Sequence, residues 1–173
     1  GMSWRQIVDP TDVQALRDSV DGIAREARSH GAHGLVGEFG NDLNAPNGEL
    51  WFTESLAAYD EHLLSWAFWV YEEWSQGAWG LYDFTEGAEG PERAALRGPM
   101  ADLLARPYPQ AVTGRLDSVS WDSSTQTLTV DMQGEGRHTI AAPARAWPLP
   151  PRATCDGDPA DVVASGPGRV DVS

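Results

Sequence analysis

Two short apolar runs limit what this chain can fold into more than any other feature of its sequence. The first is LVG at 35–37, and the second is SWAFWVY at 65–71. Neither run alternates apolar with polar side chains, and such runs are typical of parallel strands covered by helices. The first run is followed by Glu38, and the second ends at Tyr71 and Glu72. Because functional groups of parallel α/β folds gather at the C-terminal strand ends, these residues mark a candidate site.

Helical periodicity surrounds the two apolar runs. Apolar residues recur at helical spacing over 10–30, which predicts an amphipathic helix that ends at Gly31. The segments 51–64 and 91–105 predict a second and a third helix, and 72–90 predicts a loop rich in Gly, Trp and acids. The order helix, strand, helix, strand, helix indicates an α/β unit.

The sequence changes character after Arg106. A Pro-rich connector, RPYPQAVTG, leads into a segment at 118–143 in which polar and apolar residues alternate. Alternation with turns rich in Ser, Thr and Gly predicts antiparallel strands. We therefore expect an α/β domain over 1–106 and a small antiparallel β-sandwich over 107–173.

The charge of the chain limits its partners. Twelve Arg and no Lys face 26 acidic side chains, which gives a net charge of −14. An acidic surface repels phosphate, which argues against nucleic acid and anionic membrane surfaces as partners. The chain has no run of about 18 apolar residues that could span a membrane. The first ten residues, GMSWRQIVDP, lack the apolar segment of a signal peptide, which leaves the localisation open.

Metal and cofactor chemistry receives little support from the sequence. Cys155 is the only cysteine, which excludes an internal disulfide and a cysteine metal cluster. Asp156, Asp158 and Asp161 share a loop, but their spacing lacks the closing Glu of a calcium loop. We therefore expect neither a metal nor a cofactor.

Three motifs together resemble one protein family. GEFG at 37–40, SWAFWVYEEW at 65–74 and RPYP at 106–109 resemble, in order and spacing, the end of a glycoside hydrolase family 5 protein. The second half resembles the C-terminal β-sandwich of the endoglycoceramidases in that family. The resemblance covers nearly the whole chain. It implies strands seven and eight of a (β/α)8 barrel with their helices, followed by the sandwich.

The resemblance also implies residue roles. The family cleaves β-glycosides with retention, and endoglycoceramidases release the intact glycan from ceramide. Glu38 of GEFG would be the nucleophile, and Trp69 would be the platform beneath the sugar. Tyr71 would be a hydrogen-bond partner near the site, and Trp74 and Trp79 would line the groove for the lipid. The implied partner is a glycan or a glycolipid such as a glycosphingolipid.

Part of the family pattern is missing from this chain. A full barrel needs eight strands and about 250 residues, and this chain has room for two strands. The family's acid/base is the Glu of an Asn-Glu-Pro motif after strand four, and no Asn-Glu dipeptide occurs here. We therefore expect the chain alone to be inactive, and to need the missing barrel portion or self-association. Leu35, Val36, Phe68 and Val70 would then lie on an open apolar flank.

Other interpretations remain open at this point. The chain could be a non-catalytic glycan- or lipid-binding fragment of a split or truncated glycosidase, or a structural module only. The first half could also form a small two-layer α/β unit docked on the sandwich. Glu38 could simply cap the turn after a strand, and each Trp could serve core packing. The family is usually exported, which the first ten residues do not indicate.

Overall fold

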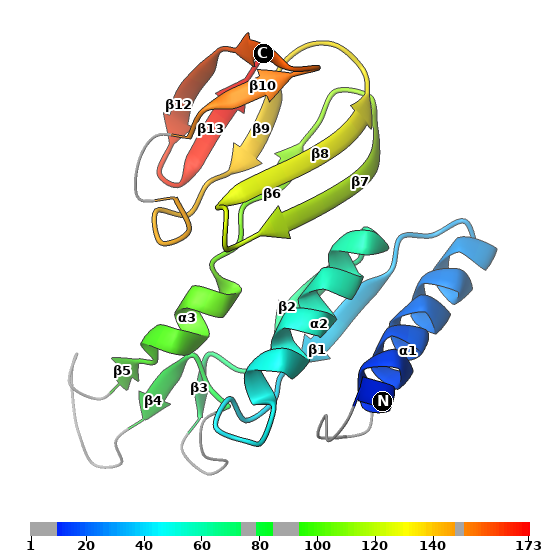
Figure 1. The fold of residues 1–173 in the computed structure, drawn as a ribbon, viewed down its shortest axis with the longest axis vertical. Helices are drawn as coiled ribbons and strands as arrows, with labels where there is room; N and C mark the ends of the chain where they lie inside the picture. The colour runs from blue at the N-terminus through cyan, green and yellow to red at the C-terminus, as the bar shows by residue number, and fades with distance from the viewer. Residues whose placement is uncertain (1–9, 74–78, 85–93, 148–150) are drawn as a thin grey trace. The chain divides into compact units, whose positions relative to one another are not determined.

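The computed structural model describes residues 10–73, 79–84, 94–147 and 151–173 (Figure 1). The chain divides into two compact units, Gly1–Leu103 and Leu104–Ser173. Trp74, which the resemblance places in a lipid groove, lies outside the described residues. Within them there are helices and small sheets and no closed barrel. No helix among them is long and apolar enough to cross a membrane.

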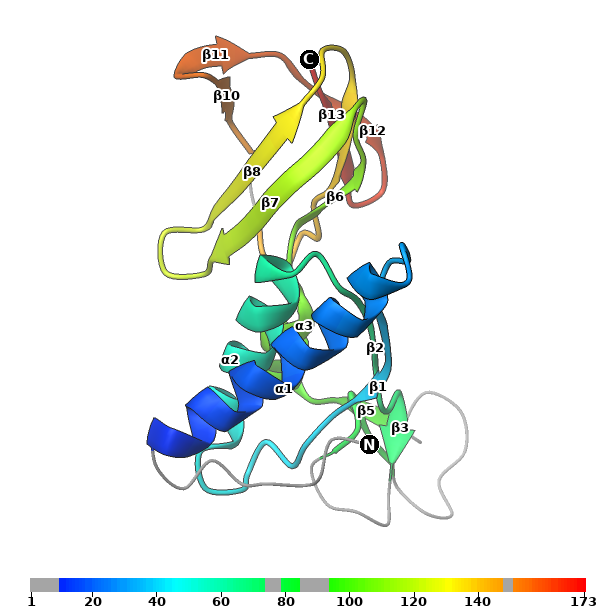
Figure 2. The same cartoon turned by 90° about the vertical axis from the view of Figure 1, so that its right-hand side faces the viewer.

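The first unit is built on a pair of parallel strands. Its elements up to the second strand are α1 (Pro10–Ser29), β1 (Leu35–Phe39), α2 (Gly48–Glu61) and β2 (Ser65–Phe68). β1 and β2 pair in parallel, α2 covers one face of the pair, and α1 packs against α2 (Figure 2). The predicted order of helices and parallel strands is therefore confirmed for these four elements.

α1 is held on α2 by apolar packing and by ion pairs. Val20 and Ala24 of α1 are almost fully buried, at 0% and 2% exposure. The Arg17 guanidinium donates to Glu54 at 2.8 Å and to Glu61 at 3.1 Å, both of which belong to α2. The apolar residues at helical spacing therefore form the face of α1 that packs on α2. Ion pairs at the edge of this face also link the two helices.

The chain after β2 differs from the prediction. The expected loop over 72–90 contains β3 (Glu72–Glu73) and β4 (Tyr82–Phe84), and the expected helix over 91–105 is wrong over 94–97, while 91–93 lie outside the described residues. There β5 (Ala94–Leu96) pairs antiparallel with β4, and α3 (Gly98–Leu104) follows. α3 starts late because the Gly-Pro pair at 98–99 suits the first turn of a helix. Proline has no N–H, and the N–H groups of a first turn have no partner within the helix.

The second unit contains antiparallel strands in small sheets. The four-stranded sheet has the order β12-β13-β9-β6, and β7–β8 and β10–β11 form two-stranded sheets. Ile140, Ala142 and Val170 form its buried apolar cluster. Two sheets facing each other as a sandwich stay a prediction. The strands are β6 (Tyr108–Ala111), β7 (Arg115–Asp122), β8 (Thr127–Gln133), β9 (His138–Ala141), β10 (Ala153–Cys155), β11 (Asp158–Ala160), β12 (Val162–Gly166) and β13 (Arg169–Val172).

The β7–β8 connection is a turn that one carboxylate organises. Asp122 accepts hydrogen bonds from the Ser124 amide and hydroxyl at 2.8 and 2.6 Å, and from the Thr125 amide at 3.3 Å. These donors, the Ser124 hydroxyl first, lower the pKa of Asp122 to about 2. The Ser-Ser-Thr turn predicted from the sequence is thus stabilised by an aspartate that stays ionised.

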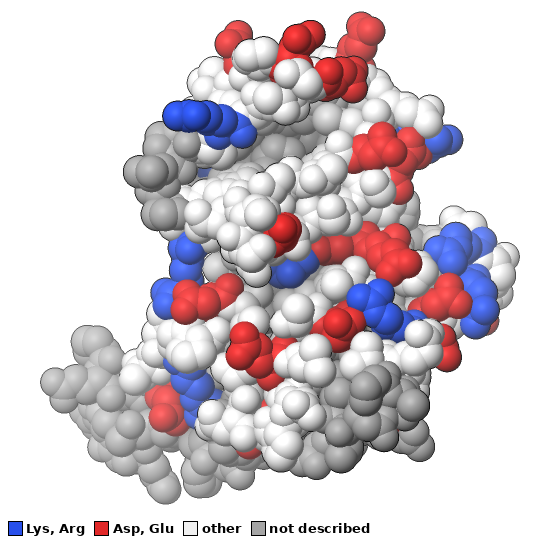
Figure 3. Space-filling model, in the orientation of Figure 1, with Lys and Arg blue, Asp and Glu red and all other residues white. Residues whose placement is uncertain are grey.

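Charged side chains are mixed over the surface. On the face drawn in Figure 3, Asp and Glu side chains are scattered and interspersed with Arg side chains. The described residues of this face therefore carry charges of both signs and no large patch of one sign, as expected from the scattered acids of the sequence.

Candidate active site at the ends of β1 and β2

Phe39 is the side chain that fixes the end of β1. It is 4% exposed, and its ring lies between α2 and β2. Aromatic rings in such edge-to-face contacts combine a large buried area with a preferred geometry. Because Phe39 is held in this way, the residue before it has a defined position. The ring-centroid distances from Phe39 are 6.2 Å to Trp51, 6.0 Å to Phe52, 5.4 Å to Tyr59, 5.1 Å to Trp66 and 5.9 Å to Phe68.

A bulge in β1 directs Glu38 away from the helices. Val36 pairs with Trp66 and Phe39 with Phe68. β1 therefore advances by three residues where β2 advances by two, which places one extra residue in β1. Val36 and Phe39 are both buried, although simple alternation would send residues three apart to opposite faces. Glu38, between them, is exposed. Bulges are frequent next to active sites, where they re-aim a side chain.

The bulge also corrects one expectation about the open flank. Leu35 is 66% exposed, as expected, but Val36 is only 7% exposed. Val36 was expected to face the open flank, and this was wrong, because the bulge between Val36 and Phe39 lets both side chains be buried. Phe68 and Val70 are half-buried. The exposed apolar surface therefore lies on the face that carries Glu38.

Trp69 belongs to the same face as Glu38. Trp66 and Phe68 pack against Phe39, so alternation puts Ala67 and Trp69 on the face away from α2. Trp69 is 47% exposed, and its backbone N–H donates to the Phe39 carbonyl at 2.8 Å. Glu38 is thus the penultimate residue of β1, and Trp69 is the first residue after β2.

Gly40 allows the two strand ends to meet. A Cβ at this position would overlap the backbone carbonyl oxygen of Trp69. The peptide bond between Trp69 and Val70 is cis. Only glycine leaves room for this close approach of the two backbones. The second Gly of GEFG is therefore required for steric reasons that the sequence alone does not show.

Tyr71 has an aromatic neighbour that sequence reasoning missed. Tyr71 is 63% exposed, and its ring centroid lies 4.8 Å from that of Tyr82 on β4. The Tyr82 N–H donates to the Tyr71 carbonyl at 2.8 Å. Tyr82 lay in a segment predicted as loop, although the run LYDF at 81–84 has the aromatic content of a short strand. Trp79, another predicted site residue, is half-buried in the turn before β4.

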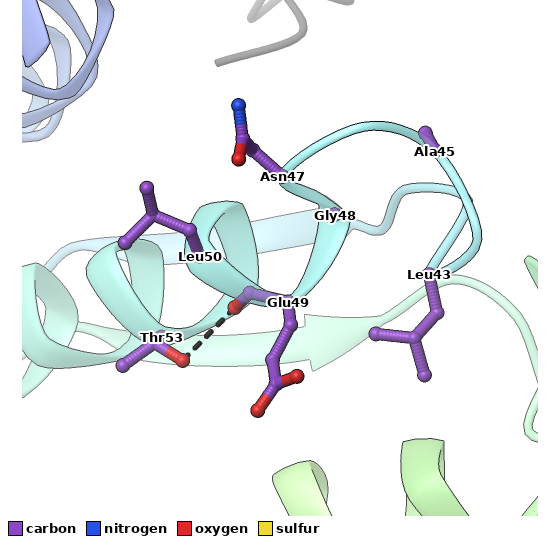
Figure 4. Close-up of a pocket in the computed structure, with 7 residues that line it drawn as sticks. All are labelled: Leu43, Ala45, Asn47, Gly48, Glu49, Leu50 and Thr53. Atoms are coloured by element: carbon purple, nitrogen blue, oxygen red, sulfur yellow. Dashed lines mark hydrogen bonds between the residues drawn. The ribbon is translucent and has the colours of Figure 1, made fainter. Parts of the chain in front are cut away.

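Two further features of the described chain bear on where a site could lie. At the start of α2, an open hollow of about 520 Å³ is lined by loop and helix residues (Figure 4). It contains no predicted site residue, and the Thr53 hydroxyl within it donates to the Glu49 carbonyl at 2.9 Å. No group of three or more His, Cys, Asp and Glu side chains in the described residues could hold a metal. The hollow is lined by Leu43, Ala45, Asn47, Gly48, Glu49, Leu50 and Thr53.

Several solved structures of one enzyme are similar in fold to this chain. Endo-glycoceramidase II from Rhodococcus sp. aligns over 91% of this chain, as the lactosyl-enzyme intermediate with a TM-score of 0.68 and 21% identity. Its ganglioside GM3 complex aligns over the same share with a TM-score of 0.69 and 20% identity. The chain has the fold of part of an endoglycoceramidase. It spans about a third, 34%, of the length of the first of these structures.

The likeness to endoglycoceramidases, predicted from GEFG, the Trp-rich run and RPYP, is therefore confirmed at the level of the fold. The coverage fits a C-terminal portion of such a protein. No family model matches the sequence. No curated protein matches it either. At this identity the shared fold does not carry over the roles of single residues, so these belong to the proposal below.

Proposed function

We propose that this chain carries the nucleophile of a retaining β-glycosidase of the endoglycoceramidase type. The observation that supports it most is the hydrogen bond from the Trp69 N–H to the Phe39 carbonyl, which brings Trp69 beside Glu38. Both residues lie at the C-terminal ends of paired parallel strands, on the face away from α2. In (β/α)8 barrels the functional groups occupy this end of the strands.

Each residue has a role that its position permits. A carboxylate oxygen of Glu38 forms a bond to the anomeric carbon while the bond from that carbon to the aglycone oxygen breaks. The half-exposed ring of Trp69 supports the apolar face of the sugar, and the Tyr71 hydroxyl hydrogen-bonds near the site. Trp79, together with Trp74, contacts the lipid part of a glycosphingolipid-like substrate. The solved structures of Endo-glycoceramidase II include a lactosyl-enzyme intermediate and a ganglioside GM3 complex.

The acid/base comes from outside this chain. The leaving oxygen needs a proton, and in retaining enzymes the second carboxyl lies about 5–5.5 Å from the nucleophile. No Asn-Glu dipeptide occurs in the sequence. The missing barrel portion, or a second copy, would supply this group and cover the exposed Leu35 on the face of Glu38. Exposed apolar surface of this kind marks an interaction face.

A second candidate function is glycan or glycolipid binding without cleavage. The absent acid/base motif favours it, since the exposed rings of Trp69 and Tyr71 could hold a sugar without any chemistry. The two candidates share the same residues and differ in whether Glu38 reacts.

Turnover and binding assays on the chain alone test the proposal. We expect no release of methylumbelliferone from its β-lactoside, and measurable lactose binding by NMR titration. Trp69→Ala should weaken this binding about tenfold or more, because the stacking surface is lost. Tyr108→Ala, an aromatic residue of similar exposure in the second unit, should leave binding unchanged. Turnover that Glu38→Gln abolishes would contradict the missing acid/base, and lack of both turnover and binding would contradict both functions.

A further inference from the structure

Arg97 joins the segments that follow β2. Its guanidinium donates to the Asp83 carboxylate at 3.0 Å and to the Gly80 carbonyl at 3.4 Å. Its backbone N–H donates to the Leu81 carbonyl at 2.9 Å, and its own carbonyl accepts from the Ala101 N–H of α3 at 2.9 Å. The Arg97 side chain is only 17% exposed, whereas the Asp83 carboxylate that it binds is 64% exposed, so the guanidinium is held in the fold while its ionic partner faces solvent.

The segment that Arg97 holds, 80–83, lies against the residues that follow Trp69. The Leu81 N–H donates to the Val70 carbonyl and the Tyr82 N–H to the Tyr71 carbonyl, each at 2.8 Å. The rings of Tyr71 and Tyr82 are also in contact. A displacement of 80–83 would therefore be passed on to the backbone directly after Trp69.

Arginine suits this position better than lysine. Its planar guanidinium offers several donors in fixed directions, so it can bind a carboxylate and a backbone carbonyl at once. Lysine carries a compact charge that would keep one of these contacts and lose the other. The two contacts come from Gly80 and Asp83, on either side of the pair of residues that bonds Val70 and Tyr71.

We propose that Arg97 is a positioning residue for the candidate site, which holds the 80–83 segment and thereby fixes the aromatic arm Trp69–Tyr71. It acts through this backbone and touches no substrate. This proposal rests on the proposed function only in treating Trp69–Tyr71 as part of a substrate site. The contacts of Arg97 with the 80–83 segment do not depend on that function.

Amide hydrogen exchange and ¹⁹F NMR test this proposal on the whole chain. In Arg97→Gln we expect the amides of Leu81 and Tyr82 to exchange about tenfold faster, because the segment opens more often. The amides of Trp51 and Leu64, which bond within the α2 region, should keep their rates. With 5-fluorotryptophan, the resonance assigned to position 69 by Trp69→Phe should shift in Arg97→Gln.

Two variants serve as controls. Arg97→Lys should give intermediate exchange rates at Leu81 and Tyr82 and return the ¹⁹F resonance part of the way, while the Trp51 and Leu64 amides keep their rates. Arg25→Gln removes an exposed pair with Asp21 on α1 and should change none of these signals. Unchanged exchange at Leu81 and Tyr82 would overturn the proposal.

An equal acceleration at Trp51 and Leu64 would overturn it as well, because Arg97 would then stabilise the whole unit. Lactose binding by the wild-type chain is measured in the same samples. Its absence would count against the proposed function and would leave the exchange result to decide the role of Arg97.

Discussion

Phe39→Ala is expected to lower the free energy of unfolding of the first unit by about 3–5 kcal/mol. Phe39 is 4% exposed and contacts five aromatic rings, so its removal leaves a cavity that α2 and β2 cannot both close. The change would also release the end of β1 that carries Glu38. Urea unfolding followed by NMR signals of the first unit measures the loss without interference from the second.

Tyr59→Phe is the matched control in the same cluster. It keeps the ring and removes a hydroxyl that, like that of Ser55, makes no hydrogen bond of good geometry. Burial raises the pKa of Tyr59 to about 12, against a smaller opposing effect of the Ser55 hydroxyl. We expect the free energy of unfolding to change by less than about 1 kcal/mol, or to rise, since the buried hydroxyl that is removed makes no well-formed hydrogen bond within the described residues. Equal effects of the two variants would show that Phe39 does not anchor β1.

Gly40→Ala is expected to separate the ends of β1 and β2. The added Cβ would overlap the Trp69 carbonyl oxygen, which belongs to the backbone and cannot rotate away. The Trp69 N–H bond to Phe39 should lengthen or break, at a cost of about 1–3 kcal/mol. Amide exchange at Trp69 reports on this bond, and lactose binding reports on the displaced indole.

Gly37→Ala provides the control for this prediction on the same strand. A Cβ at Gly37 would meet nothing within 4 Å. We therefore expect stability within about 0.5 kcal/mol of the wild type and unchanged exchange at Trp69. If both glycine variants behave alike, the close approach of Gly40 and Trp69 does not determine the geometry of the site.

The parts of the fold that repeat a simple pattern could be predicted from the sequence. The helical spacing over 10–30 identified α1, and the continuous runs identified the parallel pair of β1 and β2. The burial of Val36 could not be predicted, because it depends on a bulge that shifts the alternation by one residue. The strand β5 was missed because its residues pair with β4 across a distance in sequence that local propensity does not register.

The candidate site shows the same division. Glu38 stands out because a carboxylate follows an apolar run, whereas Trp69 was assigned from the family resemblance. Glycine is required at position 40 because its backbone contacts the Trp69 carbonyl, which the sequence does not show. The position of Tyr82 beside Tyr71 depends on pairing between β3 and β4. The role of Arg97 likewise depends on contacts with Gly80 and Asp83, which periodicity does not predict.

Covalent labelling of the chain tests the role of Glu38 most directly. A 2,4-dinitrophenyl 2-deoxy-2-fluoro-β-lactoside needs no acid catalyst, because its leaving group departs unprotonated, and the fluorine slows hydrolysis of the adduct. It therefore isolates the nucleophile from the missing acid/base. We expect mass spectrometry to find one glycosyl ester, on Glu38, which is absent in Glu38→Gln and unaffected in Glu54→Gln. A chain that stays unlabelled, or an ester on another carboxylate, would contradict the assignment of Glu38 as the nucleophile.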